Sequence, residues 1–99
     1  MVYQLRTYTI NRGMMDSWIN LFNEQIRPLH DRLGIPVQST WVNVDRTEFI
    51  WIRQFNDASE IQAKEAEYFA SPERTELADR PTSHIAKMEV KVINSVASA

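Results

Sequence analysis

Two arginines and two aromatic residues are spaced so that they share faces of predicted strands. Arg6 and Tyr8 stand two positions apart in VYQLRTYTI, and Trp51 and Arg53 stand two positions apart in EFIWIRQF. Successive side chains of a strand point to opposite faces, so each pair lies on one face. Because arginine binds planar anions in a bidentate way, the four residues predict a pocket for a small anionic or aromatic ligand. The alternative is structural: the arginines extend to the end of the sheet or pair across a dimer.

A carboxylate and a phenol come from a predicted helix over residues 57–70. At about 100° per residue, Glu65 falls within the apolar arc of that helix. This arc is formed by Ala58, Ile61, Ala66, Tyr68 and Phe69. A carboxylate on the core side needs a partner. We therefore expect Glu65 either to face an internal cavity and pair with a sheet arginine, or to bend to the rim and meet Lys64 or solvent. In the first case Glu65 and Tyr68 lie over the central strands, where Arg6 faces the cavity and Leu5 does not.

Three further residues have side chains that suit a site. Trp41 lies in the predicted strand 35–44, and His84 directly precedes the predicted strand 85–93; both are candidate pocket residues. A histidine titrates near neutral pH, so His84 is a candidate general acid or base, although a structural role fits it as well. His30 flanks the apolar stripe of the first predicted helix, where we expect a rim residue.

Several kinds of chemistry are excluded by what the sequence lacks. It contains no cysteine, and it matches none of the patterns GxGxxG, Walker A, HExxH and GxSxG. Neither histidine has carboxylates at ligand spacing, so we expect no metal and no cofactor. The net charge of −2 gives no footprint for nucleic acid. The apolar runs are too short for a membrane span, and the start of the chain does not resemble a signal peptide, so we expect a cytoplasmic protein.

The order of the predicted elements is β-α-β-β-α(α)-β. Apolar residues step by three and four from Met15 to Leu33, which predicts a helix with a kink at Pro28 and an end at Gly34. A second helix follows Asp57 as N-cap, and a third begins at Ser71 and closes at Pro81. The predicted strands cover residues 2–10, 35–44, 48–55 and 85–93, and the tail 95–99 is expected to fray.

This order predicts an α+β fold, the ferredoxin-like βαββαβ sandwich, as a single domain over residues 1–99. Two helical segments cover one face of a four-stranded antiparallel sheet whose central strands are the first and third. Strand 48–55 is apolar on both faces, with Phe49, Trp51 and Phe55 on one and Ile50 and Ile52 on the other. The helices cover only one face, so we expect a homodimer through the other sheet face.

The sequence also resembles the NIPSNAP family over nearly its whole length. The resemblance is carried by YQLRTYTINRG, by a helix with Trp18 and Pro28-Leu29, by FIWIRQF, and by EYFASPE followed by SHIAKMEV. It implies the fold and face-to-face dimer of the dimeric α+β barrel proteins. That superfamily includes cofactor-independent monooxygenases of antibiotic biosynthesis and small haem-degrading enzymes. The resemblance assigns no catalytic residues, because the family has none that are agreed.

Two classes of function remain open at this point. One is a small-molecule enzyme, a cofactor-independent oxygenase or isomerase acting on an aromatic or polyketide-like substrate. The other is a ligand-binding or protein-interaction module without turnover. The lack of a convincing acid, base and nucleophile set favours the second class, and the aromatic pocket favours the first.

Overall fold

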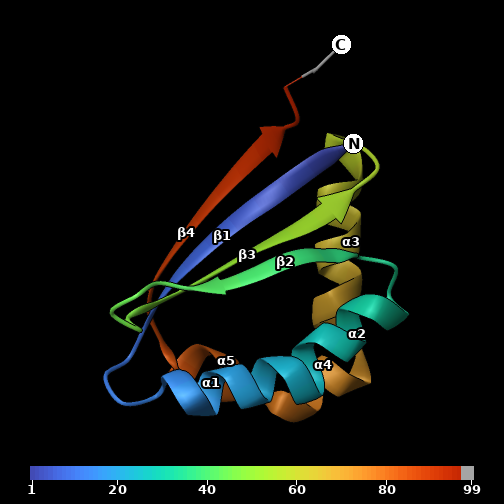
Figure 1. Cartoon of the computed structure of the whole chain (residues 1–99). Coiled ribbons are helices and arrows are strands. Elements are labelled where there is room, and N and C mark those ends of the chain that lie inside the picture. The colour runs from blue at the N-terminus through green and yellow to red at the C-terminus, as the bar shows by residue number, and fades with distance from the viewer. Residues whose placement is uncertain (97–99) are drawn as a thin grey trace.

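The chain folds into one antiparallel sheet with all helices on the same side (Figure 1). The structure is a computed structural model, and it describes residues 1–96. The strand order is β2-β3-β1-β4, with the first and third strands at the centre as expected. The elements are β1 (Val2–Ile10), α1 (Met15–Leu21), η1 (Phe22–Ile26), α2 (Arg27–Arg32), β2 (Val37–Val42), β3 (Glu48–Phe55), α3 (Ala58–Ala70), α4 (Pro72–Leu77), α5 (Arg80–Ser83) and β4 (Ile85–Asn94).

The predicted helix starts after β3 are confirmed by their caps. The Asp57 carboxylate accepts a hydrogen bond from the Glu60 backbone N–H at 3.1 Å and begins α3. Ser71 Oγ accepts from the Arg74 backbone N–H at 3.2 Å and begins α4. Each cap satisfies one of the N–H groups that the first turn of a helix leaves without a partner.

The first helical stretch adapts to Pro28 through a π-helical turn. η1 lies directly before the proline-containing helix α2, and the Arg27 N–H donates to the Phe22 carbonyl five residues earlier. A proline lacks the N–H that an α-helix needs, and a local π turn is one way to accommodate such a break. The stretch ends as predicted, with Gly34 at a φ of 72°.

Three details of the expected elements are wrong. The second strand is shorter than the predicted 35–44, because β2 covers Val37–Val42. Pro81 does not close α4, which ends at Leu77; it lies in the first turn of the short helix α5, where its missing N–H costs nothing. In α3 only Tyr68 is buried, and Phe69 is 59% exposed. The inward stripe of α3 is therefore rotated from the predicted arc and is formed by Ile61, Lys64, Glu65 and Tyr68.

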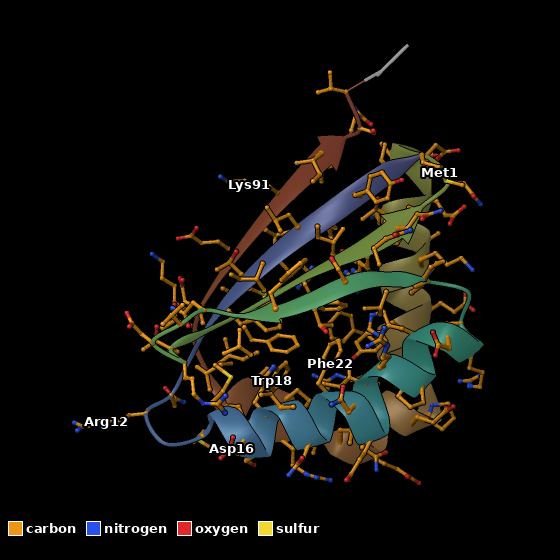
Figure 2. All side chains as sticks on the ribbon, in the orientation of Figure 1. Met1, Arg12, Asp16, Trp18, Phe22 and Lys91 are labelled. Carbon is orange, nitrogen blue, oxygen red and sulfur yellow. The ribbon has the colours of Figure 1, made fainter. Side chains whose placement is uncertain are left out.

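The helices cover the face of β3 that carries Phe49, Trp51 and Phe55, which are at most 3% exposed. Figure 2 shows Trp18 and Phe22 pointing from the first helical stretch toward the sheet, and Trp18 lies 5.8 Å from Phe49 between ring centres. The opposite sheet face has no helix over it. Its half-buried apolar side chains are Tyr3, Leu5, Ile50, Ile52 and Ile93.

No helix in the described residues 1–96 is long and apolar enough to cross a membrane. The expectation for the tail falls mostly on residues 97–99, which lie outside the described part.

Candidate ligand site between the sheet and the helices

A cavity of about 100 Å³ lies between the sheet and its helices. The central strands supply Arg6 and Tyr8 from β1 and Trp51 and Arg53 from β3; the helix α3 supplies Glu65 and Tyr68. These six residues are the sequence candidates that the fold brings together. The register of β1 and β3 explains why the four strand residues lie close together, because Arg6 pairs with Trp51 and Tyr8 pairs with Phe49.

Arg53 is held by three neighbours at the buried end of the site. It is 4% exposed, and its Nε donates to Gln4 Oε1 at 2.8 Å. One terminal nitrogen donates to His30 Nε2 at 3.1 Å, and the other forms a salt bridge with Glu65 at 2.9 Å. Burial lowers the pKa of Arg53 to about 10, which leaves it charged at neutral pH. Each nitrogen of the guanidinium therefore already has a protein partner.

His30 is neutral and fixed in one tautomer. Its Nδ1 lies 2.8 Å from the Ile26 carbonyl, which can only accept, so Nδ1 carries the proton and Nε2 accepts from Arg53. Burial lowers the pKa of His30 to about 4, and the nearby positive charge of Arg53 adds to this effect. The expectation of a rim residue is wrong, because His30 is 1% exposed. Through its Nε2 atom, His30 orients the Arg53 guanidinium.

Arg6 is held more loosely than Arg53. Its Nε donates to the Tyr8 hydroxyl and one terminal nitrogen to Gln4 Oε1, both at 2.8 Å. The other terminal nitrogen contacts only Met88 Sδ, at 3.2 Å. A thioether sulfur is a weak acceptor, so this nitrogen remains able to bind an anion. Tyr8 accepts from Arg6, which leaves its own proton free to donate.

Two indole N–H groups at the cavity have no partner. Trp18 and Trp51 both line it, but their Nε1 atoms have almost no surface that water could reach and no hydrogen bond in the described structure, so the two N–H groups do not open into the cavity. A buried donor without an acceptor costs about 1–3 kcal/mol. Two guanidinium groups also lie near the Trp51 ring, that of Arg6 at 5.8 Å and that of Arg53 at 5.5 Å from its centre. With three arginines against one glutamate in its lining, the cavity is rich in donors and poor in acceptors.

Glu65 supplies the acceptors of the site. Its Oε1 receives hydrogen bonds from Gln4 and Arg53, both at 2.9 Å, and no protein donor within the described residues reaches its second oxygen. The expected pairing with a sheet arginine is thus seen in the geometry. Lys64, the alternative partner, instead donates to the Leu33 carbonyl at the end of α2.

Two sequence candidates lie away from the cavity. Trp41 is 60% exposed on the open face of the sheet, because it pairs with Ile50 in the register of β2 and β3. His84 is buried but does not line the cavity: its Nδ1 donates to the Arg80 carbonyl at 2.6 Å and its Nε2 accepts from Ser17. Both are corrections to the predicted pocket.

Sequence reasoning also missed two residues that shape the site. Gln4 does not line the cavity, but it links both arginines to Glu65, and its place two positions before Arg6 was the available signal. Arg74, from α4, lines the cavity with its guanidinium 5.9 Å from the Tyr68 ring and 5.4 Å from the Phe69 ring. No sequence pattern places Arg74 there, because the turn between α3 and α4 determines its position.

The family is decided by a match over almost the whole chain. The NIPSNAP profile matches residues 3–99. The chain belongs to the NIPSNAP family. No curated protein matches the sequence. Among the described residues of this NIPSNAP protein, no group of three or more His, Cys, Asp or Glu side chains is arranged to hold a metal ion.

Solved structures share the fold at low sequence identity. An uncharacterized NIPSNAP domain protein from Burkholderia xenovorans has a TM-score of 0.88 at 16% identity, covering 100% of this chain and 98% of the other. A NIPSNAP family protein from Agrobacterium tumefaciens has a TM-score of 0.90 at 12% identity, covering 99% and 95%. A putative antibiotic biosynthesis monooxygenase from Nitrosomonas europaea has a TM-score of 0.73 at 8% identity, covering 98% and 100%. The ferredoxin-like α+β fold expected from the sequence is thereby confirmed.

Proposed function

We propose that this NIPSNAP protein binds a small organic anion with an apolar body in the cavity between its sheet and helices. The observation that carries the proposal is the Arg6 guanidinium, which lines the cavity and has one terminal nitrogen held only by the Met88 sulfur. A charged donor with so weak a partner favours a ligand with acceptor oxygens.

The charge of the site favours the same class of ligand. Three guanidinium groups line the cavity, those of Arg6, Arg53 and Arg74, against the single carboxylate of Glu65. His30 adds no charge at neutral pH, because burial lowers its pKa to about 4. A carboxylate or phenolate neutralises this excess, and a guanidinium binds a planar oxyanion well.

The size of the cavity limits what it holds. An engineered cavity of roughly 150 Å³ in another protein binds benzene, and the cavity here is about 100 Å³. Because it is smaller than that cavity, it holds the carboxylate head group of a ligand, and the ring or chain of the ligand extends out of it.

Isothermal titration with benzoate tests the binding, with benzamide as the neutral ligand of the same shape. We expect benzoate to bind and benzamide to bind at least tenfold more weakly. Arg6→Ala removes the available charged donor, and a charged hydrogen bond is worth about 1.5–3 kcal/mol, so the benzoate affinity falls about 10–100-fold.

Arg12→Ala is the matched control, because Arg12 is exposed in the loop after β1 and points away from the sheet (Figure 2). It leaves the affinity unchanged. Benzoate that binds no better than benzamide, or Arg6→Ala and Arg12→Ala proteins with equal affinities, contradicts the proposal.

A second candidate function is a cofactor-independent oxidation of the bound anion by dioxygen. It is supported by the free second oxygen of Glu65, a base within the cavity, and by the fold shared with a protein named as a putative monooxygenase. Glu65 takes a proton from a hydroquinone, and Arg6 and Tyr8 stabilise the phenolate. Dioxygen then accepts two electrons and two protons, which gives quinone and hydrogen peroxide.

Oxygen uptake with a single-ring hydroquinone tests this second function. Removing a general base costs about 10²–10⁴-fold in rate, so Glu65→Gln lowers the uptake at least a hundredfold while Arg12→Ala does not. Uptake no faster than the uncatalysed reaction assigns the protein to the alternative class, a binding module without turnover, and leaves the benzoate result standing.

For the partner of this protein we propose a second copy of the chain, seated on the open sheet face. The support is the row of half-buried apolar side chains there, with Leu5 beside Ile52 and Trp41 beside Ile50 in the sheet register. An apolar surface of this kind loses contact with water when two sheets pack face to face. The ligand cavity lies on the opposite side of each sheet and is not covered by this contact.

A further inference from the structure

An apolar row continues from the cavity along the edge strand β4. Met88, Val90 and Val92 alternate along the strand and face the helix side of the sheet, and they are 43%, 42% and 55% exposed. The intervening Lys91 faces the other way and points away from the helices in Figure 2. The helices thus leave a large apolar strip uncovered on the face that carries the ligand cavity.

This strip lies directly beside the polar row of the site. In the register of β1 and β4, Tyr8 pairs with Met88, Arg6 with Val90 and Gln4 with Val92. Paired residues of neighbouring strands have Cβ atoms about 4.5–5.5 Å apart on the same face. Charged and hydrogen-bonding groups therefore stand in one row and apolar groups in the next, with Met88 common to the strip and the cavity.

A second apolar group, the Phe69 ring, flanks the cavity on the helix side. Phe69 of α3 lines it and is 59% exposed, and the Arg74 guanidinium lies against the Phe69 ring. A large aromatic ring left exposed at the rim of a donor-rich cavity is suited to covering the body of a bound molecule.

We infer that the ligand is an anionic amphiphile, with its anionic head in the cavity and a hydrocarbon chain lying along Met88, Val90 and Val92. This inference rests on the proposed function and names its ligand class. The cavity has room only for a head group, so any longer part of a ligand lies outside it. The strip is the apolar surface that continues from it. From Met88 to Val92 the strip extends about 14 Å along the strand, at roughly 3.4 Å per residue, which suits an extended chain of medium length.

Titration with butyrate, hexanoate and decanoate tests the inference, in the concentration range where light scattering shows no micelles. Burying a methylene strengthens binding by up to about fourfold. The strip covers one side of the chain, so we expect a gain of at least tenfold from butyrate to decanoate. The double variant Val90→Thr/Val92→Thr keeps the shape and the preference for strand structure but makes the strip polar. It weakens decanoate binding at least fivefold and leaves butyrate binding unchanged.

Val44→Thr is the matched control, because Val44 is 99% exposed in the turn between β2 and β3. It changes neither affinity. Equal affinities for butyrate and decanoate overturn the inference while the anion site stands. Binding of none of the three acids, together with no binding of benzoate, overturns both. A threonine variant that changes the mass in sedimentation but not the chain-length preference assigns the strip to a contact between copies, and also overturns the inference.

Discussion

At the scale of single residues, the two sheet arginines differ in what remains for them to bind. Arg53 has a protein partner on every nitrogen, including a histidine and a carboxylate. Arg6 has one nitrogen held only by the Met88 sulfur. The buried Arg53 network therefore sets the shape of the site, and Arg6 is the arginine that we propose to recognise the ligand. The sequence predicts that both arginines share a face with aromatic residues, but it contains no sign of this division, which depends on His30 and Gln4 reaching Arg53 from other elements.

His30 makes the stability of the fold depend on pH. Its pKa is about 4 in the folded protein and 6.5 in a model peptide, so the unfolded chain binds the proton more tightly. The stabilisation that comes from the neutral, buried His30 is fully present above pH 6.5 and is lost as the pH falls toward 4. Between pH 7.5 and 4.5 the wild-type protein loses about 2–3 kcal/mol of unfolding free energy through this one group.

Urea unfolding of the wild-type and His30→Gln proteins at these two pH values measures the effect. Other titrating groups are common to both proteins, so the difference in pH dependence belongs to His30. A His30→Gln protein that loses as much stability on acidification as the wild type contradicts the neutral, buried state of this histidine.

At the scale of elements, the junction of α3 and α4 positions two residues of the cavity. Ser71 is 6% exposed; its Oγ donates to the Tyr68 carbonyl at 2.7 Å and accepts from the Arg74 N–H. One hydroxyl thus ends the helix that carries Tyr68 and begins the helix that carries Arg74. The sequence predicts this junction well, because serine followed by proline is a strong helix start. What it does not predict is that the junction brings Arg74 to the cavity.

Ser71→Ala removes the cap and leaves the first turn of α4 without an acceptor. The expected cost is about 1–2 kcal/mol of unfolding free energy in urea, with a several-fold loss of benzoate affinity. Asp57→Ala is the matched control: it removes the exposed cap of α3 at a cost of about 1 kcal/mol and leaves benzoate affinity unchanged. Equal effects of the two variants on binding exclude a role for the junction in the site.

The other elements differ in how well the sequence predicts them. The sequence predicts the bounds of β3 without error, because its apolar residues begin after Glu48 and the polar pair Asn56-Asp57 follows Phe55. The inward face of α3 is misjudged because Ala58, Ala66 and Phe69 are apolar yet exposed, while Glu65 and Lys64 point inward to specific partners. Trp41 is misplaced because a strand pattern shows which residues share a face but not which face the helices cover.

At the scale of the whole molecule, the two faces of the sheet differ in what covers them. One face carries the core and the cavity beneath the helices, and the other has no helix over it and leaves Leu5, Ile50 and Ile52 half-buried beside the exposed Trp41. If a second copy covers this open face, the cavities of the two copies lie on the outer sides of the assembly. Assembly and ligand binding are then independent of each other.

Ile52→Asp tests the assembly in sedimentation equilibrium at micromolar concentration. The wild-type chain is expected at twice its mass of 11.6 kDa, and the variant at the single mass with an unchanged circular dichroism spectrum. A charge on an apolar interface is left desolvated and unpaired, which separates the copies. Val44→Asp, at a site 99% exposed, remains a dimer. A wild-type mass of 11.6 kDa contradicts the proposed partner.

The central claim is that the cavity is a site for an anion, and the three indole N–H resonances of the protein test it most directly. The Trp18 and Trp51 side chains line the cavity, whereas Trp41 lies on the opposite face of the sheet. In a titration of ¹⁵N-labelled protein with benzoate, we predict that the Trp18 and Trp51 signals shift together along one binding curve while the Trp41 signal stays in place. Signals of Trp18 and Trp51 that do not move at saturating benzoate, or a shift confined to Trp41, contradict the account.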